Sequence, residues 1–386
     1  MKIVHYFARF RLEDGGVVRA VLDLAGLMAA GGHEVEIVSL DPTDVPQAWR
    51  QDHPALPKVT QISGIGGPFG HMNAAAKSTW HQALENADAV HLHTPWDPAN
   101  ISLANEARRN GIPSIVSIHG MLDDWSMQQR NLKKRLYLML RGRRFLEECN
   151  YVHATASKEH EQASKWYPKG RGAVIPLVFD LAPYQQLPGV ELAQQQWPAL
   201  ATEDPVILFL SRLHPKKGAE TLIAAAQKLK DRGTTFQLVL AGSGDAPYVA
   251  QIKQQVKDSG LSSCTTLTGH VSGADKISLY QSADVMALPT NQENFGFIFP
   301  ESLACGTPVM TTRGVDTWPE LEASGGAMIV DRTPEAFALK LQELIENQDQ
   351  LVKMGNLGQQ WVFDTFASDS ILSQYVDMYE NRVESC

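Results

Sequence analysis

Short apolar runs alternate with longer amphipathic stretches along the first half of the chain. Each run is short enough for a β-strand, and residues with a helical spacing of apolar positions follow it. The apolar runs are KIVHYF (2–7), EVEIVSL (34–40), AVHLHT (89–94) and IPSIVSIHG (112–120), and the helical stretches include 17–33 and 102–111. This alternation predicts βαβ units and a parallel, buried sheet.

A second series of apolar runs follows a break. The break, residues 176–205, is rich in Pro and Gln and has no sustained strand, so we predict a linker there. The later runs are VILFLSRL (206–213), FQLVLAGSG (236–244), CTTLTGHV (264–271), ADVMALPT (283–290) and TPVMTT (307–312). We therefore predict an α/β protein with two doubly wound domains.

Composition agrees with two well-packed domains, because 386 residues with 44% hydrophobic content exceed one ordinary core. The net charge of -9 argues against a general nucleic-acid binder. Four scattered cysteines indicate neither a disulfide framework nor a zinc site, and no apolar run reaches the roughly 20 residues of a membrane-spanning helix. We expect a cytoplasmic protein that is not integral to a membrane.

Residues with binding chemistry lie where the predicted strands end. In open parallel sheets, ligands bind outside the carboxyl ends of the strands. The glycines, histidines and charged residues at these ends are Gly15, Gly16, His93, His119, Arg212, Lys217, Gly242, Gly244 and Glu293. Two facing sheets would place them around one cleft.

The loop SRLHPKKG (211–218) carries Arg212 and Lys217 between a predicted strand and a predicted helix. A guanidinium fork and an ammonium group can both bind phosphate oxygens, so a diphosphate is the expected ligand. The alternative is that both are ordinary solvated charges.

The stretch TNQENFGFIFPESLACGTPV (290–309) carries two glutamates, one in a loop and one in the first turn of a predicted helix. Pro300 suits that first turn, and free backbone N–H groups there and around Gly296 would form an anion site. Glu301 could accept hydrogen bonds from a ribose, or it could merely complement the helix dipole. Glu293 could contact a sugar hydroxyl or stabilise a cationic transition state, or it could be a solvated loop charge.

The motifs SRLHPKKG, LAGSGD, LTGHV and ENFGFIFPESLACGTPV, in this order, closely resemble the donor-binding half of the retaining glycosyltransferases of family 4. The resemblance spans most of residues 206–330. It implies the GT-B fold, in which a sugar nucleotide binds between two Rossmann-like domains that face each other across a cleft.

The resemblance also implies a role for each matching residue. The diphosphate would contact Arg212 and Lys217, the ribose would contact Glu301, and the base would lie near Gly242 and Val271. The implied donor-binding residues are, in full, Gly15, Gly16, Arg212, Lys217, Gly242, Val271, Glu293, Asn294, Phe295, Gly296 and Glu301.

The N-terminal half resembles the same family more loosely. LEDGGVVRA places Gly15 and Gly16 just before a predicted helix, where the family's glycine loop approaches the phosphates. SIHGMLDDW presents His119 and Gly120 at a strand end, where the family has a histidine near the sugar and acceptor. Without the resemblance, a lone histidine is more often a structural hydrogen-bonding group.

His91 and His93 alternate along one predicted strand and therefore share a face. They could bind a metal ion, but no third ligand stands at a suitable spacing. Asp123 and Asp124 do not form the D-x-D metal motif of the other major glycosyltransferase fold. We therefore predict no metal ion and no cofactor, with a nucleoside diphosphate sugar as substrate.

The stretch 130–146 has seven Lys or Arg residues and no acid, and Leu132, Leu136, Met139 and Leu140 form an apolar stripe at helical spacing. Such a helix could lie on an anionic membrane and meet a lipid-linked acceptor. The alternative is a helix docked on its own domain with a solvated basic face.

Together these features predict a retaining hexosyltransferase that moves a sugar from a UDP- or GDP-sugar to a glycan or lipid-linked acceptor, in cell-surface polysaccharide or lipid-linked glycan assembly. Its predicted catalytic residues are His119, Glu293, Arg212 and Lys217. Two alternatives are a sugar-nucleotide epimerase of the same fold and a noncatalytic sugar-nucleotide-binding subunit. The expected domains are an acceptor-binding domain at 1–180, onto which a C-terminal helix at 365–386 packs back, and a donor-binding domain at 181–364.

Overall fold

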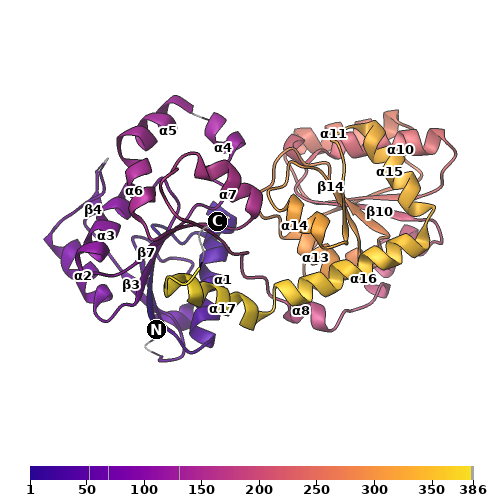
Figure 1. Cartoon of the computed structure of the whole chain (residues 1–386). Helices are drawn as coiled ribbons and strands as arrows, with labels where there is room; N and C mark the ends of the chain where they lie inside the picture. Colours follow the sequence, from indigo (N-terminus) through magenta and orange to yellow (C-terminus); the bar gives the residue numbers. More distant parts are fainter. Residues whose placement is uncertain (52, 68, 130, 384–386) are drawn as a thin grey trace. The chain divides into compact units, whose positions relative to one another are not determined.

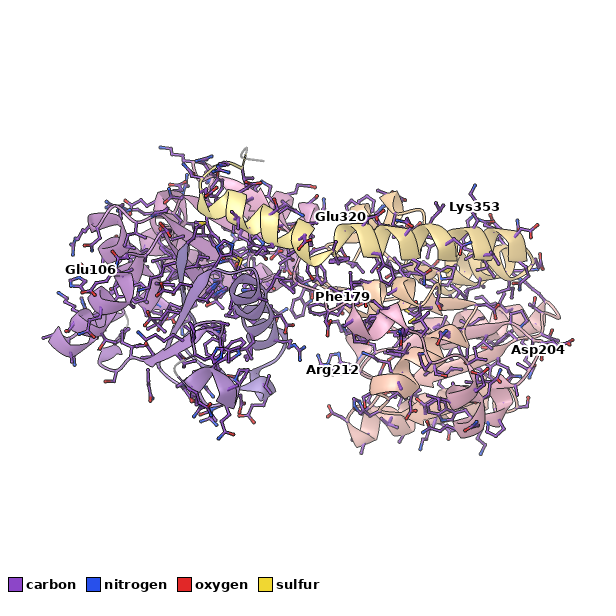
Figure 2. The ribbon with its side chains drawn as sticks, turned by 90° about the horizontal axis from the view of Figure 1, so that it is seen from below. Glu106, Phe179, Asp204, Arg212, Glu320 and Lys353 are labelled. Atoms are coloured by element: carbon purple, nitrogen blue, oxygen red, sulfur yellow. The ribbon has the colours of Figure 1, made fainter. Side chains whose placement is uncertain are left out.

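The computed structural model describes residues 1–51, 53–67, 69–129 and 131–383 (Figure 1). The chain divides into two compact units. The first contains residues 1–179 together with the C-terminal segment that begins at Ser368, and the second contains Asp180–Ala367. Phe179, labelled in Figure 2, is the last residue of the first unit before the chain enters the second.

The first unit is built on a seven-stranded sheet in which every neighbouring pair of strands is parallel. The strands, in their order across the sheet, are β3 (Lys58–Gln61), β2 (Glu34–Ser39), β1 (Lys2–Tyr6), β6 (Ala89–His93), β7 (Ser114–Ser117), β8 (Tyr151–Ala154) and β9 (Gly172–Val174). All four predicted apolar runs form strands here. The strand order reverses between β1 and β6, which is therefore the topological switch point of this sheet.

The two faces of this sheet differ in chemistry. One face buries Val4, Tyr6, Val90, Leu92 and Val116 in a core completed by Trp80 of α2 (Ala74–Leu84). The opposite face carries polar side chains that are equally buried, and these are His5, His91, His93, Ser117 and His153. Because side chains alternate along a strand, the two sets cannot mix.

Helix α17 (Ser368–Tyr379) lies beside α1 (Gly16–Ala30) in the first unit (Figure 1). A Cβ atom on Gly31, at the end of α1, would lie 2.5 Å from the Leu372 side chain, so a glycine there permits the close approach. Tyr375 and Tyr379 of α17 are buried against the histidine-bearing face of the sheet.

Further elements of the first unit are α3 (Pro98–Arg109), α4 (Asp124–Gln128), α5 (Asn131–Tyr137), a π-helical turn at Leu138–Gly142, α6 (Arg143–Glu148) and α7 (Ser157–Ser164). It also contains 3-10 turns at Leu12–Asp14 and Gln47–Arg50 and a small hairpin of β4 (Ile65–Gly66) and β5 (His71–Met72). The predicted basic helix at 130–146 is thus two α-helical segments joined by a π turn. Arg130 lies outside the described residues.

The second unit contains a six-stranded parallel sheet. Its strands, in order across the sheet, are β12 (Thr265–Gly269), β11 (Gln237–Ala241), β10 (Val206–Leu210), β13 (Val285–Ala287), β14 (Val309–Thr311) and β15 (Ala327–Ile329). The five runs of the second series all form strands, and the switch point lies between β10 and β13. The prediction of two Rossmann-like, doubly wound domains is confirmed.

The linker prediction for residues 176–205 was wrong for most of its length. This stretch contains α8 (Ala182–Gln185), α9 (Glu191–Gln196) and a 3-10 turn at Pro198–Leu200. The Ala193 N–H donates to Ser278 Oγ of α12 (Gly273–Gln281) at 3.0 Å, and the Gly189 N–H donates to Gln281 Oε1 at 2.8 Å. The segment is therefore docked on the second unit.

Six further helices in the described part of the second unit are α10 (Ala219–Asp231), α11 (Ala246–Asp258), α13 (Ile298–Ala304), α14 (Trp318–Ala323), α15 (Pro334–Ile345) and α16 (Gln348–Thr365). Among the helices of the described ranges, none has the length and apolar character that a membrane span requires. Cys149, Cys264 and Cys305 carry free thiols, and Cys386 lies outside the described residues.

Candidate functional site

The loops that follow β10 and β13 meet at the carboxyl edge of the second sheet. The Asn291 N–H donates to the Lys216 carbonyl at 2.8 Å, which ties one loop to the other. Gly218 has a φ of 79°, and a Cβ atom there would lie 2.1 Å from the Pro289 carbonyl oxygen. A glycine is therefore required where the two loops come closest.

Lys217 forms an ion pair with Glu293 across these loops. The lysine is only 8% exposed, although it belongs to a loop. Burial, together with the positive charges of Lys216 and Arg212, lowers the pKa of Lys217 to about 8. Arg212 itself is exposed, and its side chain extends outward from the ribbon of the second unit (Figure 2).

The loop that carries Glu293 is held by the segment after β14. The Glu293 carbonyl accepts from the Asp316 N–H at 2.9 Å, and the Asn294 side chain donates to Asp316 Oδ2 at 3.1 Å. The Thr317 hydroxyl donates to the Phe295 carbonyl at 3.1 Å. These bonds fix the Glu293 loop before any ligand arrives.

Gly296 allows a tight turn in the same loop. Its φ is 69°, and a Cβ atom would lie 2.6 Å from the Phe299 ring and 2.9 Å from Cγ of Glu293. Phe295 is buried, with its ring edge-on to those of Phe297 and Phe366. The aromatic residues therefore pack inward beneath the charged edge.

Glu301, in the first turn of α13, is held by two side chains from α12. Lys276 Nζ donates to Oε1 at 2.7 Å, and the Tyr280 hydroxyl donates to Oε2 at 3.0 Å. Each carboxylate oxygen has a second lone pair and can accept one more hydrogen bond. Neither Lys276 nor Tyr280 was recognised from the sequence, because no local motif marks them.

Gly242 and Val271 lie on the other side of β10. Gly242 has a φ of 142°, and a Cβ atom would lie 1.8 Å from the Ser211 carbonyl oxygen. Its N–H donates to the Gly269 carbonyl at 2.8 Å, and half-buried Val271 follows two residues later. The second unit thus gathers Arg212, Lys217, Gly242, Val271, Glu293, Asn294, Phe295, Gly296 and Glu301 at or near one sheet edge.

Gly15 and Gly16 belong to the first unit, as does His119. Gly15 precedes α1 with a φ of 108°, and no side chain caps the helix. A Cβ atom on either glycine would meet nothing within 4 Å, so the backbone conformation and not crowding demands glycine at Gly15. The first N–H groups of α1 therefore lack a side-chain partner at the edge that follows β1.

His119 follows β7 in a left-handed conformation, with a φ of 50°. The buried carboxylate of Glu159 holds this turn, because Oε1 accepts from the Gly120 N–H. Glu159 Oε2 accepts from the N–H and the hydroxyl of Thr155 at 2.6 and 2.7 Å. Glu159 was missed from the sequence, since an acid inside a helix carries no signal of such a contact.

A chain of hydrogen bonds joins His91, Ser117 and His153 to α17. His153 Nε2 must donate to the Ile175 carbonyl, 2.8 Å away, so its Nδ1 accepts from Ser117 Oγ at 2.6 Å. Ser117 Oγ then accepts from His91 Nε2 at 2.7 Å, and His91 Nδ1 accepts from the Tyr379 hydroxyl at 2.8 Å. Every proton in this chain is therefore assigned.

His5 provides the third nitrogen ligand that the sequence analysis did not find near His91 and His93. One ring nitrogen from each of the three lies within 4.8 Å of the other two. The expectation that no third ligand stands at a suitable spacing was wrong, because parallel pairing of β1 with β6 places His5 directly beside His91. Both nitrogens of His91 are already hydrogen-bonded, so a metal ion would have to displace one of these bonds.

Asp123 and Asp124 have structural partners. Asp123 caps α4 by accepting from the Ser126 N–H, and Asp124 pairs with Lys165 at 2.6 Å. Neither carboxylate belongs to a cluster of metal-ligand type in the described part of the chain.

Comparison with known proteins identifies both units. The family model for group 1 glycosyl transferases matches residues 192–361, and the model for the glycosyl transferase 4-like domain matches residues 15–177. Two doubly wound parallel sheets of this kind define a two-domain α/β protein of the GT-B class. The two models together cover most of the chain and both describe glycosyl transferases, so the chain belongs to the glycosyltransferases of the GT-B fold.

Relatives of the chain include two Mycobacterium tuberculosis enzymes. The GDP-mannose-dependent alpha-(1-6)-phosphatidylinositol monomannoside mannosyltransferase is 29% identical over 45% of this chain and 47% of that protein, so this match spans about half of the relative's length. The corresponding dimannoside mannosyltransferase is 27% identical over 91% of this chain and 89% of that protein.

Solved structures share the fold. Anabaena HepE in complex with UDP superposes with a TM-score of 0.76 and 18% identity over 98% of this chain and all of that chain. Sucrose-phosphate synthase of Thermosynechococcus elongatus gives a TM-score of 0.72 and 20% identity, with 98% of each chain covered. At this level of identity the likeness bears on the fold alone.

Proposed function

We propose that the protein transfers a sugar from a nucleoside diphosphate sugar to an acceptor hydroxyl, with retention at the anomeric carbon. The observation that carries the proposal is the ion pair of buried Lys217 with half-buried Glu293 at the switch point of the second sheet, with Arg212 exposed at the same edge. Ammonium and guanidinium groups complement a diphosphate. The use of GDP-mannose by the Mycobacterium tuberculosis relatives supports a sugar nucleotide as donor.

In this proposal Arg212 and Lys217 bind the diphosphate and stabilise the negative charge that develops on it as the sugar leaves. A preorganised cation in a poorly solvated site stabilises such charge more strongly than it would in water. Lys217 meets these conditions because it is buried and held by Glu293. The donor would be a UDP- or GDP-sugar.

Other donor contacts follow from the same edge. Glu301 would accept from the ribose hydroxyls with the lone pairs that Lys276 and Tyr280 leave open. The base would lie by Gly242 and Val271, and the sugar beside the Asn294–Gly296 backbone. In the first unit, the start of α1 after Gly15 and Gly16 is also suited to bind phosphate oxygens.

The proposed chemistry is attack from the face that the diphosphate leaves. A double displacement needs a carboxylate nucleophile, and Glu293 is occupied as the partner of Lys217. His119 would orient the sugar or the acceptor. A leaving phosphate that also accepts the proton of the incoming hydroxyl would then complete the transfer.

An epimerase of the same fold and a noncatalytic binding subunit are the rivals. Family membership favours transfer over both, since the matched models describe glycosyl transferases. The decisive difference is acceptor dependence. An epimerase consumes its donor without an acceptor, and a binding subunit does not consume it at all.

The first test of the donor site is to measure the binding of UDP, GDP and ADP by calorimetry. We expect one nucleotide to bind to the natural protein and to bind at least tenfold more weakly to Arg212→Ala, since a charge-assisted bond contributes roughly 1.5–3 kcal/mol. Arg232→Ala removes an exposed arginine of the same unit whose side chain donates to Gln342, and this variant should bind the nucleotide normally. Release of nucleotide from the matching sugar nucleotide, dependent on glycan or lipid-linked acceptors, then tests transfer. Equal binding by all three proteins would contradict the site.

We further propose that residues 131–146, the described part of the predicted basic helix, contact an anionic membrane. Leu132, Met139 and Leu140 are 85%, 73% and 67% exposed, whereas Phe145 and Leu146 are buried and anchor the segment. Arg143 and Arg144 form ion pairs with Glu147 and Glu148, whereas the guanidinium groups of Arg135 and Arg141 lie over the rings of Trp166 and Phe69. A cavity of about 390 Å³ lies beside the segment, and Glu148 in its lining pairs with Arg108 and Arg144. The rest of the lining is Arg141, Asn105 and the apolar residues Ile101, Ala104, Leu140 and Phe145.

Sedimentation with lipid vesicles tests this contact. The protein should pellet with vesicles that contain phosphatidylglycerol and stay in solution with pure phosphatidylcholine, because apolar insertion and charge attraction act together. The double variant Leu132→Ser, Met139→Ser should lose most of the pelleting. A control double variant, Leu339→Ser with Val352→Ser, alters apolar residues of the second unit that are 57% and 61% exposed, and it should retain pelleting. Equal pelleting by both variants would contradict the proposed surface.

A further inference from the structure

A second chain of imidazole rings runs from the interior of the first sheet to His119. His5 Nδ1 lies 3.2 Å from His93 Nε2, and His93 Nδ1 lies 3.2 Å from His119 Nε2. The rings of His5 and His93 are stacked 5.5 Å apart, and those of His93 and His119 are stacked 5.4 Å apart. Each link is a nitrogen-to-nitrogen hydrogen bond, so each contains one proton and one lone pair.

All three rings are neutral, because burial lowers the pKa of each, to about 3 for His5 and His119. A neutral imidazole carries a single ring proton. His93 uses both nitrogens in the chain, so it must donate in one link and accept in the other. Only two arrangements satisfy this condition. Protons point either from His5 toward His119, or from His119 toward His5.

The inner end of the chain distinguishes the two arrangements. His5 Nε2 is buried and has no hydrogen-bond partner among the described residues. If protons point toward His119, this atom is a bare lone pair. If they point the other way, it is an N–H group with no acceptor. Buried N–H groups without a partner are rare, whereas under-satisfied acceptors are tolerated more often.

The outer end of the chain, His119 Nδ1, is compatible with either direction of the protons. His119 is half-buried, and its Nδ1 makes no hydrogen bond with any residue in the described part of the chain. Water can therefore meet either an N–H group or a lone pair at this atom. The surroundings of His5 Nε2 therefore decide the direction of the protons, and this direction determines whether His119 Nδ1, at the other end of the chain, carries a proton.

We propose that His5 and His93 are positioning residues that hold His119 in the tautomer with its proton on Nδ1. His119 then presents a hydrogen-bond donor at the carboxyl edge of β7, and it does not serve as a base. Its ligand is an oxygen with a free lone pair, such as a sugar hydroxyl or a phosphate oxygen. The identity of that oxygen rests on the proposed transferase function, whereas the tautomer itself does not.

The neighbouring chain through His91 provides an internal control. It ends at Tyr379 and contacts the first chain only through ring stacking between His91 and His5 or His93. Replacing Tyr379 by Phe removes one hydrogen bond at that end. It leaves every proton between His5 and His119 in place.

Nitrogen NMR of the protein labelled with ¹⁵N-histidine tests the proposal without any substrate. The His119 signals are assigned by their loss in His119→Gln. We expect Nδ1 of His119 to be protonated and Nε2 to be bare in the natural protein at neutral pH. Protonation on Nε2 would overturn the proposal.

Two substitutions at His93 test whether the chain sets this tautomer. His93→Ala removes the donor to His119 Nε2 and leaves room for water there, so His119 should become a mixture of both tautomers. His93→Asn keeps an N–H group close to the original Nδ1 and should preserve the natural spectrum, as should Tyr379→Phe. An unchanged His119 spectrum in folded His93→Ala would show that the chain does not control it. If His93→Ala does not fold, the spectrum of the natural protein still confirms or overturns the proposed tautomer.

Kinetics separates this inference from the proposed function. With a working donor and acceptor, His93→Ala should lower kcat about fivefold and leave donor KM nearly unchanged, as expected for one weakened hydrogen bond. If no sugar nucleotide supports transfer, the proposed function fails. The NMR result would still confirm or overturn the tautomer.

Discussion

Lys217 Nζ and Glu293 Oε2 form an ion pair that joins the loop after β10 to the loop after β13. These loops follow the two strands on either side of the switch point, where the chain leaves the sheet in opposite directions. The pair therefore serves two purposes that experiments can separate. It holds the loops together, and it sets an ammonium group where a diphosphate would bind.

Lys217→Ala should lower transfer by about 10²–10³-fold, the usual effect of removing one electrostatic stabiliser of a transition state. It should also destabilise the second unit, because Glu293 loses its partner in a largely buried position. Adding Glu293→Gln to this variant should restore stability and leave transfer low. If the double variant recovered both stability and transfer, the role of Lys217 would be limited to neutralising Glu293. Lys228→Ala, which breaks an exposed pair with Glu335, is the matched control and should change neither.

Donor binding should weaken above about pH 8. The pKa of Lys217 is lowered to about 8 by burial and by Lys216 and Arg212, so its ammonium group loses its proton there, well below the ordinary lysine value of 10.5. Each further pH unit should reduce nucleotide affinity by up to about tenfold. Stability should change in the opposite direction. The unfolded chain holds this proton more tightly than the folded protein, so folding is favoured as pH rises from 8 toward 10.5.

Calorimetry of nucleotide binding between pH 7 and 10 checks this prediction. Lys217→Arg keeps its charge over the whole range and should lose the alkaline decline. If the decline persists in Lys217→Arg, another group titrates.

Gly242→Ala should destabilise the second unit by roughly 2 kcal/mol more than Gly233→Ala. Both glycines have a positive φ, 142° and 83°, so both substitutions strain the backbone. Only Gly242 is crowded, with the Ser211 carbonyl oxygen 1.8 Å from a new Cβ atom, whereas nothing lies within 4 Å at Gly233. Urea unfolding of the two variants measures the difference. Equal losses would show that Ser211 can move away.

The central strands could be predicted because parallel strands buried on both faces are continuous apolar runs. β10, VILFL, is such a run, and it is buried throughout. β3, KVTQ, lies at the sheet edge and is only partly buried, so its sequence has no apolar run to recognise. α9, ELAQQQ, buries only Ala193, and its docking depends on Ser278, which is far away in the sequence. Pattern alone therefore indicated a linker.

Some residues of the candidate site could likewise be predicted from the sequence, and others could not. Arg212, Lys217 and Glu293 could be proposed from the sequence because charged residues at strand ends share one edge of a parallel sheet. The partners of Glu301 could not, because Lys276 and Tyr280 come from a helix whose packing no local pattern specifies. His5 was missed for another reason. Its place beside His91 depends on β1 pairing with β6, which lie more than 80 residues apart.

Stability should fall steeply below about pH 6.5 because of the buried histidines. Burial lowers the pKa of His5 and His119 to about 3 and that of His153 to about 4, and it lowers the pKa values of His91 and His93 well below the ordinary 6.5. The unfolded chain takes up protons at these groups as the pH falls from 6.5 toward 4, and the folded protein does not. Their contribution to stability is therefore complete above pH 6.5. Below that pH, each histidine lowers the free energy of unfolding by roughly 1.4 kcal/mol for every pH unit.

The slope of unfolding free energy against pH, measured in urea between pH 6.5 and 4.5, isolates this effect from any change in packing. His5→Phe removes one such group and should reduce the slope by roughly 1.4 kcal/mol per pH unit, whatever it does to stability at pH 7. His53→Phe replaces an exposed histidine and should leave the slope unchanged. An equal slope in all three proteins would mean that His5 takes up its proton without unfolding. The face of the sheet that α17 covers would then have to admit water or charge, which the hydrogen bonds around His91 and Tyr379 argue against.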